Sequence, residues 1–101
     1  MDVYPPKLLS IVVPAHNEAP GIAHAVGVII DALSPCGMDL EIIVVDDGSR
    51  DATFDRVQDL SRKDARVKGL RLTRNFGKEA ALLAGLKAAS GDAVVTIDSD
   101  L

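Results

Sequence analysis

Acidic residues follow two apolar runs of the chain and are of the types that could hold a cation. Asp98 and Asp100 stand one residue apart in a turn, and Asp46 and Asp47 are adjacent. The pair of Asp98 and Asp100 presents hard oxygen ligands, which Mg²⁺ and Mn²⁺ prefer. Neither His nor Cys lies next to this pair, which disfavours zinc. Because turns and helix caps also use Asp freely, the pair gains specificity only from its position in the fold.

Three further positions could bind a base or a phosphate. The turn at residues 46–49 could cap a helix, but two consecutive acids exceed what one cap needs. A carboxylate there could accept the ring N–H of a pyrimidine or guanine. Lys78 opens a helix-length segment, where it could meet a phosphate together with the helix N-terminus. His16 could stack on a base, donate to a phosphate or face solvent.

Four apolar runs must position these residues. They are Leu8–Val13, Ile42–Val45, Val67–Thr73 and Ala93–Ile97. We expect the first run to end at Pro14. Three of the four are nearly continuous and rich in β-branched residues, which is typical of strands buried on both faces.

The segments between the runs carry apolar residues at helical spacing. The first helix is expected to take Asn17 as its N-cap, and the second to begin near residues 49–51. The third is expected to follow Gly77. Its buried face is expected to carry Leu82, Leu83 and Leu86.

This alternation predicts an α/β fold, a Rossmann-like parallel sheet in strand order 3-2-1-4 flanked by helices. Ligands of such sheets bind at the carboxyl ends of the strands, where the strand order reverses. The turns after the first, second and fourth strands would meet there. Five acidic residues would then converge on one edge, namely Glu18, Asp46, Asp47, Asp98 and Asp100.

The composition excludes several classes of protein. With 48% hydrophobic and 26% charged residues, the 101-residue chain suits one globular domain rather than a disordered one. No apolar run approaches the ~20 residues that cross a bilayer. Cys36 is the one cysteine and the N-terminus lacks the pattern of a signal peptide, so we expect a cytoplasmic location. The chain lacks the glycine-rich dinucleotide fingerprint, the phosphate-binding P-loop and the serine-hydrolase elbow.

Charge is unevenly distributed along the chain. Its formal net charge is −4, yet residues 50–78 hold nine of the eleven basic residues and only four acidic ones. This stretch could form a face for an anionic ligand or a membrane surface, or it could be an ordinary solvated surface. Scarce aromatics and the negative total charge disfavour sequence-specific nucleic-acid binding.

Four motifs, in this order and spacing, resemble the opening half of a family 2 glycosyltransferase. They are Ile11–Glu18, Glu41–Thr53, Arg74–Ala81 and Val94–Leu101. The third resembles the branch that includes dolichyl-phosphate mannose synthase and the bacterial polyprenyl-phosphate glucosyltransferases. The resemblance implies the N-terminal, nucleotide-binding half of a glycosyltransferase A-type fold.

The resemblance also implies an activity and a set of site residues. It implies inverting transfer of a sugar from a nucleotide sugar to a polyprenyl phosphate lipid. A UDP-sugar is the favoured donor and GDP-mannose is the alternative. Asp98 and Asp100 would hold Mg²⁺ or Mn²⁺ on the diphosphate, and Asp47 would pair with the base ring N–H. The implied donor-binding residues are Pro14, Ala15, His16, Glu18, Val45, Asp47, Lys78, Asp98 and Ser99. Many members of the family carry Tyr where this chain has His16.

Residues 1–101 are therefore expected to be the nucleotide-sugar-binding part of a longer protein, ending just after Asp-Ser-Asp. The catalytic acidic residue and the acceptor pocket would follow, so this chain would bind donor without transferring sugar. The whole protein would work at the cytoplasmic face of a membrane. One alternative is a non-catalytic fragment that binds a nucleotide or pairs with a second copy through its uncovered sheet edge. A receiver-type signalling domain is a weaker one, because receivers place their acidic pair after the first strand.

Overall fold

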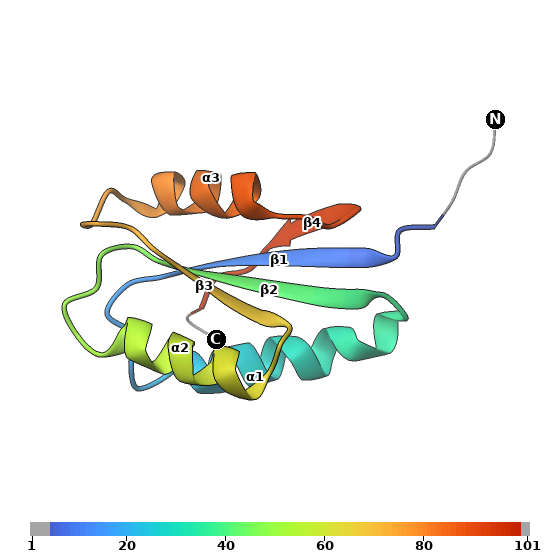
Figure 1. Cartoon of the computed structure of the whole chain (residues 1–101), viewed down its shortest axis with the longest axis horizontal. Helices are drawn as coiled ribbons and strands as arrows, with labels where there is room; N and C mark the ends of the chain where they lie inside the picture. Colours follow the sequence, from blue (N-terminus) through green and yellow to red (C-terminus); the bar gives the residue numbers. More distant parts are fainter. Residues whose placement is uncertain (1–4, 100–101) are drawn as a thin grey trace.

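The computed structural model describes residues 5–99, which form a parallel four-stranded sheet with helices on both faces (Figure 1). The elements in chain order are β1 (Leu8–Ala15), α1 (Ile22–Leu33), the short 3₁₀ helix η1 (Ser34–Cys36), β2 (Asp39–Asp46), α2 (Thr53–Lys63), β3 (Val67–Arg71), α3 (Lys78–Ala88) and β4 (Ala93–Thr96). The sheet order is β3-β2-β1-β4, which confirms the predicted Rossmann-like order. Within residues 5–99, no helix is long and apolar enough to cross a membrane.

Two apolar layers lie on the two faces of the sheet. The helices α1 and α2 cover one face and α3 covers the other (Figure 1). Successive strand side chains alternate between faces, so Ile11 packs toward α1 and α2 while Val12 packs beneath α3. β1 and β2 are thus buried on both sides, as their continuous apolar runs predict. β4 is an edge strand, and its Val94 and Val95 are each 39% exposed, so the expectation of two-sided burial is wrong there.

The buried face of α3 differs from the predicted one. Ala81 and Gly85 face the sheet, whereas Leu83 and Leu86 are 54% and 46% exposed. A β-carbon at Gly85 would lie 2.3 Å from Cγ1 of Val12, so only a residue without a side chain permits this approach. The helix therefore packs through its small residues, and the predicted leucine face is wrong except for the partly buried Leu82.

Two predicted boundaries are also wrong. β1 runs through Pro14, which is paired in register with Val45 of β2. The backbone polar groups of Pro14 point toward the β4 side of the strand, as those of Val12 do two residues earlier. Because the pairing with β4 ends at Val12, the N–H group that proline lacks would have no partner in the sheet. Asn17 does not cap α1, which begins at Ile22, but adopts a left-handed backbone with φ of 51°.

Candidate functional site

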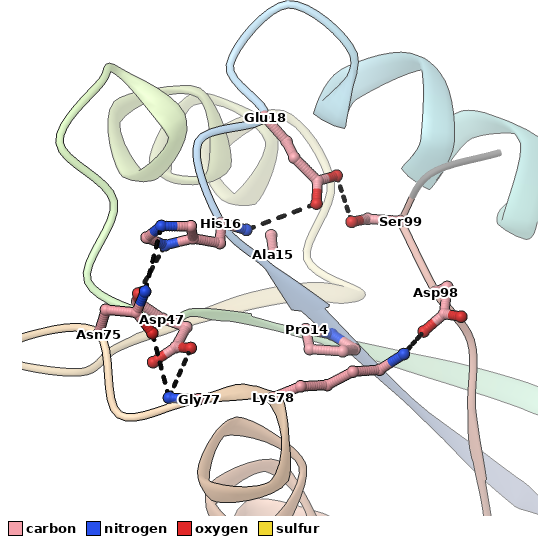
Figure 2. Close-up of a pocket in the computed structure, with 10 residues that line it drawn as sticks. All are labelled: Pro14, Ala15, His16, Glu18, Asp47, Asn75, Gly77, Lys78, Asp98 and Ser99. Atoms are coloured by element: carbon pink, nitrogen blue, oxygen red, sulfur yellow. Dashed lines mark hydrogen bonds and ion pairs between the residues drawn. The ribbon is translucent and has the colours of Figure 1, made fainter.

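A cavity of about 350 Å³ lies at the carboxyl end of the sheet, between the ends of β1, β2 and β4 and the start of α3 (Figure 2). This edge pocket is lined by Pro14, Ala15, His16, Glu18, Asp47, Asn75, Gly77, Lys78, Asp98 and Ser99. Eight of the nine predicted donor-binding residues are among them. Val45 is not, because its side chain is fully buried beneath α3. Asn75 and Gly77 were not predicted, although they lie within three residues of Lys78 in the third motif.

Asp47 connects the end of β2 to the loop that leads into α3. Its side chain is only 4% exposed, and its two carboxylate oxygens accept the backbone N–H groups of Phe76 (2.8 Å) and Gly77 (3.0 Å). A carboxylate can accept about four hydrogen bonds, so acceptor capacity remains on the side of the pocket. Asp47 thus both shapes the pocket wall and offers it a negative charge.

Asp46 has a different role from its neighbour. Its side chain is fully buried, and Oδ1 accepts the Ser49 N–H (3.0 Å) and the Ser49 hydroxyl. Nε of Arg71 lies 3.8 Å from the other oxygen. Asp46 therefore stabilises the turn between β2 and α2 and does not line the pocket, which explains the two consecutive acids. The predicted convergence of five acids holds for Glu18, Asp47 and Asp98.

Glu18 joins the loop after β1 to the segment after β4. Its carboxylate accepts a hydrogen bond from the hydroxyl of Ser99, whose residue is 7% exposed (Figure 2). Its backbone N–H donates to the Thr53 hydroxyl at the start of α2 (2.8 Å). The floor of the pocket is therefore built from residues that are far apart in the sequence.

Lys78 and Asp98 form an ion pair at the mouth of the pocket, with 2.5 Å between Nζ and Oδ1. Both side chains are more than half exposed. The carboxylate of Asp98 provides hard oxygen atoms next to the pocket, which suits a divalent cation. Asp100 lies outside the described residues, and residues 5–99 contain no group of three His, Cys, Asp or Glu side chains arranged around a metal. The fit to a cation therefore rests on Asp98.

His16 separates the edge pocket from a second cavity of about 440 Å³. This second cavity, which we call the arginine cavity, is lined by His16, Asn17, Gly48, Arg50, Thr73, Arg74 and Asn75. The basic stretch as a whole does not form one cationic face, because most of its other charges are engaged locally. Arg71 and Arg74 lie over the rings of Phe54 and Phe76. Three other basic residues pair with acids, Arg62 with Asp59, Arg66 with Asp64 and Lys68 with Glu41.

Comparison with known proteins identifies the family. Residues 10–101 match the family model described as glycosyl transferase family 2, so the match includes the carboxyl ends of all three strands that meet at the edge pocket. The chain belongs to glycosyl transferase family 2. Membership confirms the predicted resemblance and excludes the receiver domain.

Relatives within the family point to one branch. The chain is 43% identical over 93 residues to an uncharacterized glycosyltransferase of Synechocystis sp., covering 92% of the chain and 29% of that protein. It is 38% identical over 102 residues to the undecaprenyl-phosphate 4-deoxy-4-formamido-L-arabinose transferase of Pseudomonas paraeruginosa, covering 100% of the chain and 30% of that protein. The second similarity supports the predicted polyprenyl-phosphate branch. The chain spans less than a third of the length of these two relatives.

Solved structures of other proteins share the fold. A mannosyltransferase from Pyrobaculum calidifontis in complex with GDP-Man and Mn²⁺ superposes with a TM-score of 0.78 at 30% identity, covering 96% of this chain and 28% of that one. Staphylococcus aureus TarS (1–349) in complex with UDP gives a TM-score of 0.75 at 28% identity, covering 91% and 27%. The family 2 chain described here therefore has a glycosyltransferase A-type fold.

Proposed function

We propose that this chain binds the nucleotide-sugar donor of a glycosyltransferase that transfers a sugar to a polyprenyl phosphate. One observation carries the proposal: Asp47, Lys78 and Asp98 line one pocket at the reversal of strand order between β1 and β4. The similarity to an undecaprenyl-phosphate sugar transferase and to structures with GDP-Man or UDP supports it. We propose a UDP-sugar as the donor, with GDP-mannose as the competing one.

Each pocket residue has a proposed part in donor binding. The remaining acceptor capacity of Asp47 pairs with the ring N–H of the base, beside Pro14, Ala15 and His16. The Lys78 ammonium, at the N-terminal end of α3, contacts the phosphates. Ser99 and Glu18 lie toward the ribose and sugar. Val45 supports the pocket only from the core.

The diphosphate gains negative charge as it leaves the sugar, so the pocket must supply positive charge. Asp98, with Asp100, would hold Mg²⁺ or Mn²⁺, which when bound supplies Lewis-acid stabilisation of the leaving group. Lys78 adds a second cation at the same end of the pocket. We propose that transfer inverts the sugar, and that the acidic residue that activates the acceptor lies outside this chain.

Calorimetric titration of the chain with UDP and GDP, with and without Mn²⁺, tests the donor site. We expect UDP to bind more tightly when Mn²⁺ is present, and Asp98→Asn to remove that gain. Asp31→Asn, at an exposed position of α1, is the matched control. Failure of both nucleotides to bind would refute the proposal.

Catalysis and location are proposed for the whole protein. We propose that this chain alone does not transfer sugar, and that the whole protein works at the cytoplasmic face of a membrane. Lipid-phosphate-dependent release of UDP from UDP-glucose by the chain alone would contradict the first statement. Fractionation of cells that express the whole protein tests the second.

Self-association through the sheet edge stays a prediction. Among residues 5–99, β4 pairs with β1 on one side and with no strand on the other, and it exposes Val94 and Val95. The opposite edge strand β3 carries the exposed charges of Lys68 and Arg71. Charges on an edge strand oppose pairing with another chain, and β4 lacks them. We expect a second copy to pair with β4. Sedimentation of Val95→Lys against the unmodified chain tests this, and equal mass for both would contradict it.

A further inference from the structure

His16 is hydrogen-bonded to three loops of the edge pocket at once. Its Nδ1 lies 2.8 Å from the backbone oxygen of Asp47, after β2. Its Nε2 lies 3.1 Å from Nδ2 of Asn17, in its own loop, and 3.3 Å from Nδ2 of Asn75, in the loop before α3. Figure 2 shows the imidazole directed at Asp47 and Asn75.

These contacts define where the ring carries its proton. A backbone carbonyl oxygen only accepts, so Nδ1 must be the protonated nitrogen. The orientation of the Asn17 amide is fixed separately, because its Oδ1 accepts the N–H of Arg50 (2.8 Å). Oδ1 of Asn75 likewise accepts the N–H of Gly77 (3.1 Å). Both amides must therefore present their NH₂ groups to Nε2, and Nε2 can only accept.

We propose that His16 is a positioning residue that holds the three loops around the donor pocket only as the neutral Nδ1–H tautomer, and that its protonation loosens the pocket. The effect on donor binding rests on the proposed function. The tautomer of the ring and its contacts with the three loops are independent of that function.

Protonation would place a third donor between two others. Nε2–H would then face the NH₂ groups of Asn17 and Asn75, and both hydrogen bonds would be lost. Asn75 lines the edge pocket and holds Gly77, whose N–H also binds Asp47. Loss of the hydrogen bond between Nε2 and Asn75 therefore frees a residue that forms part of the pocket wall. Imidazole is the side chain that ordinarily changes charge between about pH 5 and 8.

Charged groups of both signs surround the ring. Oε1 of Glu18 lies 3.5 Å from the His16 backbone nitrogen, and the Asp47 carboxylate lines the edge pocket beside the ring. Lys78 lines the same pocket. Arg50 and Arg74 line the arginine cavity on the other side of the ring. The experiment therefore observes the ring itself.

Nuclear magnetic resonance of the ¹⁵N-labelled chain reads the ring directly. The His24→Gln variant leaves His16 as the one histidine, since the chain has two. We expect ring signals of a protonated Nδ1 and an unprotonated Nε2 at neutral pH. On acidification the amide signals of Arg50 and Gly77 should shift with the same midpoint as the ring. The opposite tautomer, or amide signals that ignore the titration of the ring, would overturn the proposal.

Calorimetry then tests the link to donor binding. UDP affinity of the His24→Gln chain should fall at least about tenfold between about pH 7.5 and 5.5, because protonation removes two neutral hydrogen bonds and each can contribute up to about that factor. His16→Gln in the same background keeps an amide near the position of Nε2 and has no titrating ring, so it accounts for protonation of UDP itself. An equal pH dependence in both variants would overturn the link. Absence of UDP binding at every pH would instead refute the proposed function, and the ring signals would still decide the role of His16.

Discussion

The Lys78 ammonium and the Asp98 carboxylate lie 2.5 Å apart and join the start of α3 to the segment after β4. This contact places a positive charge on the carboxylate that we propose as a cation ligand. A divalent ion at Asp98 must therefore compete with Lys78 for the same carboxylate. A Lys78 ammonium that such an ion displaces from Asp98 would remain at the mouth of the pocket, next to the proposed position of the diphosphate.

Replacing Lys78 should separate these two effects. In Lys78→Met we expect Mn²⁺ alone to bind more tightly by up to about fivefold, the range of an exposed ion pair. UDP without metal should bind about three- to tenfold more weakly, because a cation beside the phosphates is lost. Calorimetric titration with each ligand measures both. Lys87→Met, in the last turn of the same helix, is the control, and an equal effect there would point to net charge alone.

Asp47 is expected to be needed for stability as well as for binding. In Asp47→Asn, one carboxylate oxygen becomes an NH₂ group that faces the backbone N–H of Phe76 or Gly77. A buried donor left without an acceptor costs about 1–3 kcal/mol, so urea unfolding should show a loss of that size. Asp31→Asn at the exposed surface of α1 should change the free energy of unfolding little. Equal stability of the two variants would contradict the role given to Asp47.

The fold could be predicted from sequence because the apolar runs of β1 and β2 are long enough to require burial on both faces. The place of the pocket could also be predicted, because the turns that follow parallel strands meet at one edge of the sheet. Val45 was wrongly predicted to line the pocket. Side chains alternate along β2, and Val45 shares its face with Ile43, beneath α3.

Other features depend on distances that hydropathy does not encode. The three leucines of α3 are the most apolar residues of that helix, but the helix approaches the sheet through Ala81 and Gly85. The role of Asn75 depends on a histidine 59 positions earlier in the chain. Asn17 has the residue type of a helix cap, yet its left-handed backbone lets its side chain bind Arg50 instead.

Glu41 should make the chain sensitive to acid. The residue is 4% exposed, and burial acts to raise the pKa of its carboxyl. Hydrogen bonds from Lys68, the Ser90 N–H and the Ser10 hydroxyl outweigh burial and lower the pKa from 4.5 to about 2. A folded pKa below the unfolded one stabilises the fold above about pH 4.5, and this stability is lost as the pH falls toward 2.

Unfolding by urea at several pH values measures this contribution. Between about pH 5 and 2 the unmodified chain should lose about 2–3 kcal/mol more than Glu41→Gln, in which the group cannot titrate. Glu79→Gln, at an exposed position of α3, should keep the full pH dependence of the unmodified chain. A parallel pH dependence in Glu41→Gln would place the acid sensitivity in other carboxylates.

Gly48 should be the glycine of the pocket loops that tolerates a side chain least. Its φ is +64°, and a β-carbon there would lie 2.1 Å from the backbone carbon of Arg74 and 2.3 Å from the backbone nitrogen of Asn75. Gly48→Ala must therefore pay about 1–2 kcal/mol for the left-handed backbone and also push the two loops apart. We expect urea unfolding to show a loss of at least about 2 kcal/mol, with weaker UDP binding. Gly27→Ala in α1 meets no atom within 4 Å and should stabilise the chain by about 0.5–1 kcal/mol. If both variants unfolded alike, the contact between the loops at Gly48 and Arg74 would not be what fixes the pocket.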